Sequence, residues 1–345
     1  MTKRLANPAC FSLRNFIARK QPTHIPQRAL ACSLLGAVLG MAVSTTSAQS
    51  YPTQPIRMLV PFTAGGGTDI LARMIGQKMA ESVGQQIIVD NRPGGNSLVA
   101  TEMVVRAPPD GYVMIMHTNN LTVNPTLYKK LNYDTVRDLA PVSLVAYLPH
   151  LLVVHPSVPA NTLKEFVALA KSRPGAINFG TAGSGTVNHL TAELFQSMAG
   201  IKMTHVPYKG SGSLIPDLLG GHLEAHFAAL STVRQHVTSG KLRALALTTI
   251  KRTPLLPDLP TFDELGYKGY DFSSWFGVLA PGATPADIVN KAYTEIAKAA
   301  RRPEVQERLP EYQLVASTPQ EFAAFIKADI AKAGKIVRES GATID

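Results

Sequence analysis

Short apolar runs alternate with segments of helical periodicity along most of the chain. Apolar runs of about four to eight residues bounded by turn signals are typical of buried strands, whereas apolar residues repeated every three or four positions are typical of helices. Because the two kinds of segment alternate, the pattern predicts an α/β protein with mainly parallel sheets. The expected strands span residues 56–62, 86–91, 112–118, 150–155, 177–182, 203–208, 224–230 and 242–249, and the expected helices span residues 68–83, 96–106, 162–172, 186–199, 212–220, 285–301 and 319–340.

Two long apolar stretches, residues 140–160 and 272–285, break this alternation. We interpret them as two strands that cross between two domains, once in each direction. The first domain would then be discontinuous, with residues 49–148 and 276–345, and the second would comprise residues 149–275. Two domains joined by two crossing strands form a hinge with a cleft between them.

The last expected helix carries an apolar stripe. Residues that recur at helical spacing predict a face packed on the core, so the stripe does not indicate a cofactor site. The stripe consists of Phe322, Phe325, Ile326, Ile330, Ala333, Ile336 and Val337.

The first 48 residues differ in composition from the rest of the chain. They hold six basic and no acidic residues, then a 15-residue apolar run (residues 29–43), then small residues before Gln49. This order is typical of a secretory signal peptide, and the run is shorter than the roughly 20 residues of a membrane span. We expect residues 1–48 to be removed on export; an uncleaved membrane anchor is the alternative.

Removing this leader changes the composition of the mature chain. Both cysteines, Cys10 and Cys32, lie in the leader, so the mature chain needs no disulfide. Without the six leader cations, 28 basic residues face 24 acidic ones, and the net charge falls from +10 to +4. No arginine-rich run is interleaved with aromatic residues, so we expect no nucleic-acid partner. After Gln49 no apolar stretch approaches membrane length, so we expect a soluble mature protein.

One hexapeptide occurs twice in nearly the same form. The segments Thr63-Ala64-Gly65-Gly66-Gly67-Thr68 and Thr181-Ala182-Gly183-Ser184-Gly185-Thr186 agree at five of six positions. Each follows an apolar strand and precedes an expected helix, and each falls in a different expected domain.

Both segments, called here the first and the second loop, have the features of an anion site. Glycines let a ligand approach the backbone, and a helix start presents unpaired N–H groups and the positive end of its dipole. Thr68 and Thr186 are the expected N-cap residues. Ile70 and Asn188 replace the last glycine of a dinucleotide motif, and no P-loop lysine follows. Asp69 would repel a phosphate, so a small carboxylate fits better, although each loop could also be a plain turn.

Two other patterns suggest chemistry but have simpler explanations. Ser184 with His189 suggests a hydrolase, yet the flanking glycines of the G-x-S-x-G motif are missing. A strand carrying His222, Glu224 and His226 on one face could bind a metal, but the alternation also describes a half-exposed strand. We therefore expect no enzymatic activity, no metal and no cofactor.

Four further side chains are candidate ligand contacts. Thr118 and Asn119 end an expected strand, and they either donate to a ligand or cap the next helix. Tyr208 lies in an expected turn, and it either points into the cleft or packs against the protein. His189 lies one helical turn before Glu193, as a metal-binding pair or, more simply, as a surface pair.

Nine segments, in this order, resemble the Bug-type extracytoplasmic solute receptors of tripartite tricarboxylate transporters. The resemblance covers essentially the whole mature chain. The segments are "YPTQPIRMLVPFTAGGGTD", "VDNRPGGNSLVA", "PPDGYVMI", "NPTLYKKLNYD", "FGTAGSGTVNHLTAELF", "HVPYKG", "GKLRALALT", "LPDLPTFDELG" and "WFGVLAPGATP".

The resemblance implies a two-domain periplasmic binding protein that closes on a small carboxylate and passes it to membrane permease subunits. It implies that backbone and hydroxyl groups of Phe62–Asp69 and Thr181–Thr186 hold the carboxylate, and we expect a monomer. The chain departs from the family where Thr63 and Ala64 replace a common proline, and where residues 117–120 are bulkier than usual. A dicarboxylate, a tricarboxylate, an amino acid and an aromatic acid all remain candidates, and so does a signalling role.

Overall fold

The computed structural model describes residues 51–208 and 211–340. The expected leader, with both cysteines and the expected cleavage site, lies outside the described residues, as do residues 209 and 210 of the turn that follows Tyr208. The strands are β1 (Ile56–Val60), β2 (Ile87–Asn91), β3 (Val113–His117), β4 (Leu139–Leu148), β5 (His150–Val154), β6 (Asn178–Thr181), β7 (Thr204–Pro207), β8 (Ala225–Ala229), β9 (Arg243–Leu247), β10 (Ser274–Pro281) and β11 (Gln313–Leu314). The helices are α2 (Gly67–Val83), η1 (Gly95–Ser97), α3 (Leu98–Val105), α4 (Asn120–Leu127), α5 (Leu163–Ser172), α6 (Val187–Ala199), α7 (Ser211–Leu219), α8 (Leu230–Thr238), α9 (Ala286–Ala300), α10 (Pro303–Arg308) and α11 (Pro319–Ser340).

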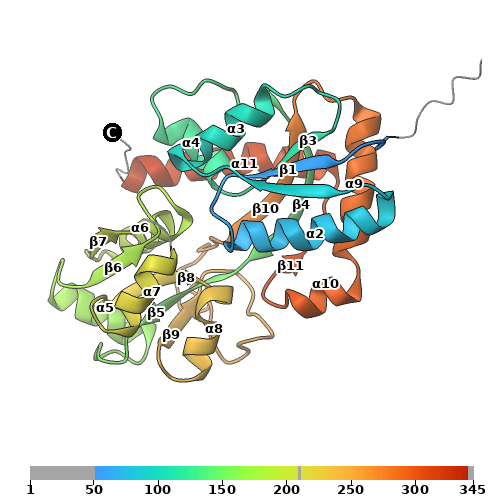
Figure 1. The fold of residues 1–345 in the computed structure, drawn as a ribbon. Helices are drawn as coiled ribbons and strands as arrows, with labels where there is room; N and C mark the ends of the chain where they lie inside the picture. The colour runs from blue at the N-terminus through green and yellow to red at the C-terminus, as the bar shows by residue number, and fades with distance from the viewer. Residues whose placement is uncertain (1–50, 209–210, 341–345) are drawn as a thin grey trace, which may run out of the picture. The chain divides into compact units, whose positions relative to one another are not determined.

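Six strands form the first sheet, in the order β11-β4-β10-β3-β1-β2 (Figure 1). Successive residues of a strand point to opposite faces, so each buried strand supplies two cores. Met58 and Val60 of β1 pack in a cluster with α2, α9 and α10, whereas Leu59 packs in a second cluster with α3, α4 and α11. Helices therefore cover both faces of this sheet.

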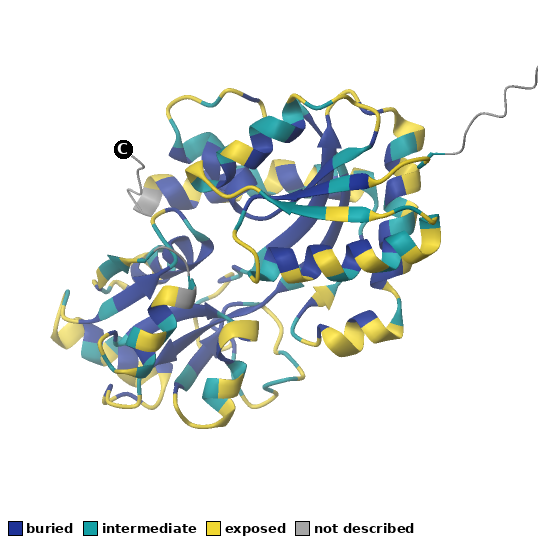
Figure 2. Ribbon diagram, viewed as in Figure 1, coloured by how far each residue is buried: buried dark blue, intermediate teal, exposed yellow. Residues whose placement is uncertain are grey.

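Five strands form the second sheet, in the order β7-β6-β8-β5-β9. Its faces are covered in the same way. Leu152 and Val154 of β5 pack in a cluster with residues of α5 and α6, and Leu151 and Val153 pack in another with residues of α7 and α8. Figure 2 shows the resulting pattern of buried strands between helices whose outer faces are exposed.

The expected α/β class with two sheets is confirmed, but the sheets are mixed and not mainly parallel. Parallel pairing joins β1 to β2 and β3, and it joins β6 to β7 and β8. The remaining pairs, which involve β4, β5 and β10, are antiparallel. The chain leaves the first sheet along β4 and returns to it along β10. These two strands are neighbours that run in opposite directions, so they pair antiparallel.

The two long apolar stretches carry the chain from one sheet to the other. β4 ends at Leu148 in the first sheet, and β5 begins at His150 in the second. Pro149 separates them because proline has no N–H to continue the ladder. β10 returns to the first sheet, and its Ser274 Oγ lies 2.8 Å from the Nε2 atom of His150, so the two crossing segments are bonded to each other.

Most elements lie where the hydrophobic pattern places them, and the stripe on α11 is confirmed. Phe322, Ile326, Ala333, Ile336 and Val337 are buried, and the other members of the stripe pack beside them. The pattern missed α4, α8, α10 and β11. None of the helices in the described ranges combines the length and apolarity that crossing a bilayer requires.

Candidate functional site

The first loop leads from β1 into α2. This helix begins at Gly67 with Gly66 at the N-cap, so the expected N-cap role of Thr68 is wrong. The backbone turns at Gly65, whose φ of +82° suits glycine, and the chain becomes helical directly afterwards. Gly67 and Thr68 therefore lie in the first helical turn, where N–H groups have no acceptor within their own helix.

The Asp69 side chain is hydrogen-bonded to the backbone of the first loop. Its buried carboxylate accepts a hydrogen bond from the Gly65 N–H at 2.9 Å and another from Arg73 Nε at 3.0 Å. Burial by itself would raise the pKa of Asp69, but hydrogen bonds from Arg73, Gly65 and Asn91 outweigh it and hold the pKa below its usual value. The first loop thus contains a permanent negative charge that is balanced by Arg73.

The second loop leads from β6 into α6, with Thr186 at the N-cap as expected. Its hydroxyl does not cap the helix; it donates to the Gly183 carbonyl at 2.6 Å. The Thr181 hydroxyl lies 3.2 Å from the same carbonyl. The two threonine hydroxyls are therefore engaged within the loop. The N–H groups of Gly183, Gly185 and Thr186 are engaged as well, which leaves the backbone N–H and the hydroxyl of the exposed Ser184 as the loop groups that can meet a ligand.

Both loops contain an internal acceptor at the same place relative to the helix start. Asp69 and His189 are each the third residue of their helix. Asp69 accepts from the N–H of Gly65, and His189 Nδ1 accepts from the N–H of Gly185 at 3.1 Å. The two acceptors differ in charge: the first is an anion, whereas the second is an imidazole.

His189 is buried and not part of a surface pair, so that interpretation is wrong. Its ring stacks on His205 with centroids 4.1 Å apart, and its Nε2 lies 3.6 Å from Glu193 Oε1. Burial, reinforced by repulsion from His205, lowers the pKa of His189 to about 4. His189 Nδ1 is engaged by the Gly185 N–H.

The side chains of Thr118 and Asn119 are hydrogen-bonded at the start of β10 and do not cap a helix. Asn119 occupies the N-cap position of α4 without a capping bond from its side chain. Its Nδ2 donates to the Ser273 carbonyl at 3.1 Å, and its Oδ1 accepts from the Trp275 N–H at 3.1 Å. The Thr118 hydroxyl donates to the same Oδ1 at 3.0 Å.

Tyr208 lies beside the second loop but is engaged elsewhere. Its N–H donates to the Thr181 carbonyl at 2.9 Å. Its hydroxyl donates to Asp217 Oδ2 at 2.6 Å, and this bond, with burial, raises the pKa of Tyr208 to about 12. The hydroxyl hydrogen is therefore already bonded.

The metal triad weighed for residues 222–226 is not formed. β8 begins only at Ala225, and Glu224 accepts from the Asn178 N–H at 2.8 Å. His226 is fully buried, with Nδ1 2.9 Å from the Gly180 carbonyl oxygen. Across residues 51–208 and 211–340, no three His, Cys, Asp or Glu side chains are grouped so that they could hold a metal ion.

Each loop also contacts a residue that the sequence did not single out. A Cβ atom on Gly185 would lie 2.5 Å from Leu127 Cδ2. The second loop therefore packs against α4, a helix that covers the first sheet. A Cβ on Gly67 would lie 3.0 Å from the Tyr312 hydroxyl, which donates to the Gly67 carbonyl at 3.0 Å. No local sequence signal marks Leu127 or Tyr312, because both contacts are made across long sequence separations.

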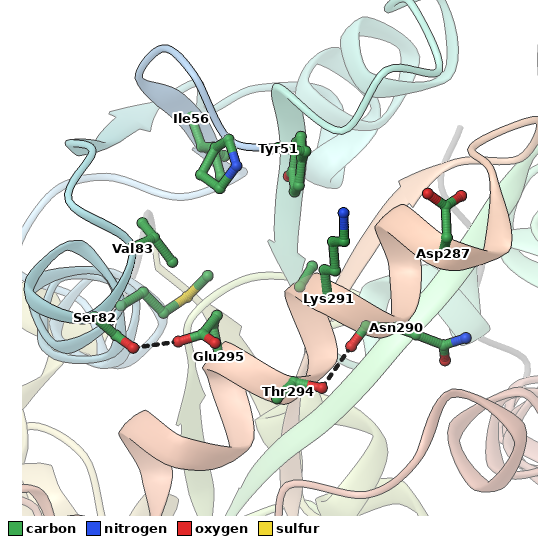
Figure 3. Close-up of a pocket in the computed structure, with 12 residues that line it drawn as sticks. Tyr51, Ile56, Ser82, Val83, Asp287, Asn290, Lys291, Thr294 and Glu295 are labelled. Carbon is green, nitrogen blue, oxygen red and sulfur yellow. Dashed lines mark hydrogen bonds between the residues drawn. The ribbon is translucent and has the colours of Figure 1, made fainter. Parts of the chain in front are cut away.

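At least three cavities lie outside the two loops. One, of about 640 Å³, lies at the crossing segments, and its walls include Asn119, Tyr147 and Trp275. Another, of about 560 Å³, lies between α2 and α9, and Figure 3 shows Ser82 and Lys291 on its walls. A third, of about 730 Å³, has Leu163, Leu242 and Leu256 on its walls. None of the three is lined by a residue of the two loops.

Hydrogen bonds join the predicted site residues into three groups. These are the first loop with Asp69, the second loop with His189 and Tyr208, and Thr118 with Asn119.

Comparison with known proteins identifies the family. Residues 71–342 match the profile of the tripartite tricarboxylate transporter family receptor. Protein BugT of Bordetella pertussis is 35% identical over 318 residues, which cover 89% of this chain and 98% of BugT. A structure from R. palustris with adipate is 35% identical, with a TM-score of 0.79, over 85% of this chain and 99% of that one. MatC from Rhodopseudomonas palustris with bound malate is 28% identical, with a TM-score of 0.75, over 83% and 100%.

The chain therefore belongs to the receptor family of tripartite tricarboxylate transporters. The resemblance to Bug-type receptors that the nine segments indicated is confirmed, and so is the α/β fold of periplasmic binding proteins.

Proposed function

We propose that this protein is a periplasmic receptor that captures a small carboxylate between its two halves and delivers it to a permease. The observation that carries the proposal is the repeated loop: each sheet contributes one glycine-containing turn that ends in a helix start. Backbone N–H groups at such a start solvate an anion without a fixed cation, which suits reversible capture. Membership of the receptor family supports the same conclusion.

The proposed domains follow the two sheets, except that the first two residues of β10 fall in the second domain. Residues 49–148 and 276–345 would form the first domain, and residues 149–275 would form the second, with a ligand cleft between them. The crossing of the chain at Pro149 and β10 supports a hinge there. We further propose that residues 1–48 direct export to the periplasm and that the mature protein is a monomer without a cofactor.

A dicarboxylate is the favoured ligand. Two relatives were solved with adipate and with malate, and both are dicarboxylates. A ligand with two carboxylates could present one to each loop. The first loop would use the N–H groups of Gly67 and Thr68, because the Gly65 N–H already donates to the Asp69 carboxylate. The second would use the backbone N–H and the hydroxyl of Ser184, because the N–H groups of Gly183, Gly185 and Thr186 are bonded within the loop.

A thermal-shift and calorimetric screen tests this function. Mono-, di- and tricarboxylates, amino acids and aromatic acids are compared, with ATP and NAD as controls. At about 100 times its dissociation constant, a bound acid should stabilise the protein by about 2.7 kcal/mol. ATP and NAD should give no shift, because neither loop has a nucleotide motif. Protection by a nucleotide together with no shift from any acid would refute the proposed ligand class.

Substituting Ser184 tests the hydroxyl contact. Ser184→Ala should weaken binding of the cognate acid by about fivefold, since one neutral hydrogen bond contributes about 1 kcal/mol. Ser172→Ala is the matched control, because this exposed serine lies in α5 and donates to the Leu169 carbonyl. Calorimetry on the two variants gives both dissociation constants. Equal affinities would mean that Ser184 does not contact the ligand.

A further inference from the structure

A pair of stacked histidines lies directly against the second loop. His189 of α6 and His205 of β7 have ring centroids 4.1 Å apart and planes inclined by 18°. Phe179 of β6 lies beside both rings, with its centroid 5.2 Å from that of His205 and 6.5 Å from that of His189. His189 is 8% exposed, and His205 is half-buried. The pair is therefore part of the packed base of the loop.

Each ring is bonded to one end of this loop. His205 Nε2 lies 2.6 Å from Thr181 Oγ1, at the start of the loop. His189 Nδ1 accepts the Gly185 N–H at 3.1 Å, near its end. The segment between Thr181 and Gly185 is the part proposed to meet the ligand carboxylate, so both rings contact its anchoring residues.

The bond to Gly185 fixes where a proton can be added to His189. A nitrogen that accepts an N–H carries no hydrogen, so the hydrogen of the neutral ring is on Nε2. An added proton must therefore go to Nδ1. That proton converts the acceptor of the Gly185 N–H into a second donor, and both groups then need an acceptor in the same place. A ligand carboxylate oxygen can accept from both.

We infer that His189 links carboxylate capture by the second loop to the uptake of one proton at Nδ1. In the neutral state, His189 Nδ1 accepts the hydrogen bond of the Gly185 N–H, so this N–H is not available to a ligand. In the protonated state, it releases that N–H and adds a positive charge beside the bound anion. The inference rests on the proposed function, because it assigns a regulatory role within the same site.

The surroundings limit the pair to one proton. Two imidazolium rings at 4.1 Å would repel each other, so the second ring stays neutral. Glu193 of α6 contacts the Nε2 side of His189. From the neighbouring elements, His226 of β8 bonds the Gly180 carbonyl, and Asp217 of α7 accepts from Tyr208.

The first loop has no comparable switch, since Arg73 and the Gly65 N–H hold Asp69 in its charged form.

The expected pH window lies below neutrality. The pKa of free His189 is about 4, and that of free His205 is lowered by burial. A bound anion raises the pKa of His189, so affinity should rise as the pH falls from 6.5 toward 4. Full linkage of one proton corresponds to a tenfold gain in affinity per pH unit.

His189→Asn is the decisive variant. The Asn side-chain oxygen can still accept the Gly185 N–H, but the amide takes up no proton. Calorimetry with adipate and with malate at pH 7, 6 and 5, in buffers of different ionisation enthalpy, gives affinity and proton uptake. Comparing variant and parent cancels the titration of the acid itself. His236→Asn, in α8, is the matched control.

The expected result is that only the parent protein and His236→Asn gain the additional affinity and proton uptake at pH 5. Binding with the same pH profile in the parent and in His189→Asn would overturn the proton linkage while leaving the receptor function intact. Failure of both acids to bind at pH 7 and at pH 5 would overturn the linkage together with the dicarboxylate assignment.

Discussion

Gly185→Ala is expected to destabilise the protein by about 2–5 kcal/mol and to weaken ligand binding at least tenfold. Gly185 has a φ of +73°, which costs a non-glycine residue roughly 1–2 kcal/mol. Its new Cβ would also lie 2.5 Å from Leu127 Cδ2. Leu127 is buried in a cluster with Val187 and Leu190 of α6, so it has little room to move, and overpacking of this kind costs about 1–3 kcal/mol. The loop must shift, and its N–H groups shift with it.

Gly240→Ala separates the two contributions. Gly240 has a φ of +72°, nearly the value at Gly185, but a Cβ there would meet nothing within 4 Å. This variant should therefore show only the conformational cost and should bind ligand normally. Denaturant unfolding measures both stabilities, and calorimetry with the acid found in the screen measures both affinities.

Leu127→Ala tests whether the contact is the cause. Removing the leucine side chain costs stability by itself, as large-to-small core changes do. In combination with Gly185→Ala, however, it makes room for the new methyl group, so the double variant should be more stable than the sum of the two effects predicts. If Gly185→Ala and Gly240→Ala prove equal in stability and affinity, the second loop does not depend on its contact with α4.

Lowering the pH from 6.5 to about 4 should remove several kcal/mol of the free energy of unfolding. His117, His150 and His226 are fully buried, and burial lowers their pKa values to about 4, 3 and 4; repulsion from His226 adds to the shift at His150. The unfolded chain takes up protons at these residues below its ordinary pKa of 6.5, but the folded chain does not. Stability is therefore present above pH 6.5 and is lost as the pH falls toward the folded pKa values.

In this window each buried histidine changes the free energy of unfolding by up to about 1.4 kcal/mol per pH unit. The three together therefore change it by up to about 4 kcal/mol per pH unit. That slope is large compared with a total stability of about 5–15 kcal/mol. Denaturant unfolding between pH 7 and pH 4.5 measures it. His226→Gln should reduce the slope by about one proton. A slope below one proton for the parent protein would contradict the prediction.

The hydrophobic pattern was sufficient for most of the fold, and its failures have local causes. β1 and α9, for example, are found within two residues of their expected limits. α4 was missed because residues 119–125 are rich in asparagine and contain Pro125 within the helix. α8 was missed because Leu230 follows β8 without a turn residue to separate them. The antiparallel crossing strands were not predicted as such, since an apolar run has no signal for direction.

The candidate site was only partly accessible to the same reasoning. The repeat of T-A-G-x-G-T identified both loops, since glycine and helix starts leave a local signature. It did not give the partners of Asp69 or of the two threonine hydroxyls in the second loop. The N-cap position expected for Thr68 and the surface position expected for His189 were wrong. Where a helix begins and which of its faces is buried both depend on the neighbouring elements.

The sequence by itself determined most of the elements, the α/β class, the two loops and the family, because these depend on periodicity and on motifs that are local in the chain. Only the tertiary structure decided which groups in the loops are already bonded and which are left for a ligand. His205 approaches His189, Leu127 approaches Gly185 and Tyr312 approaches Gly67 from distant parts of the chain. Such contacts arise from how the sheets and helices pack, and no spacing within the sequence encodes them.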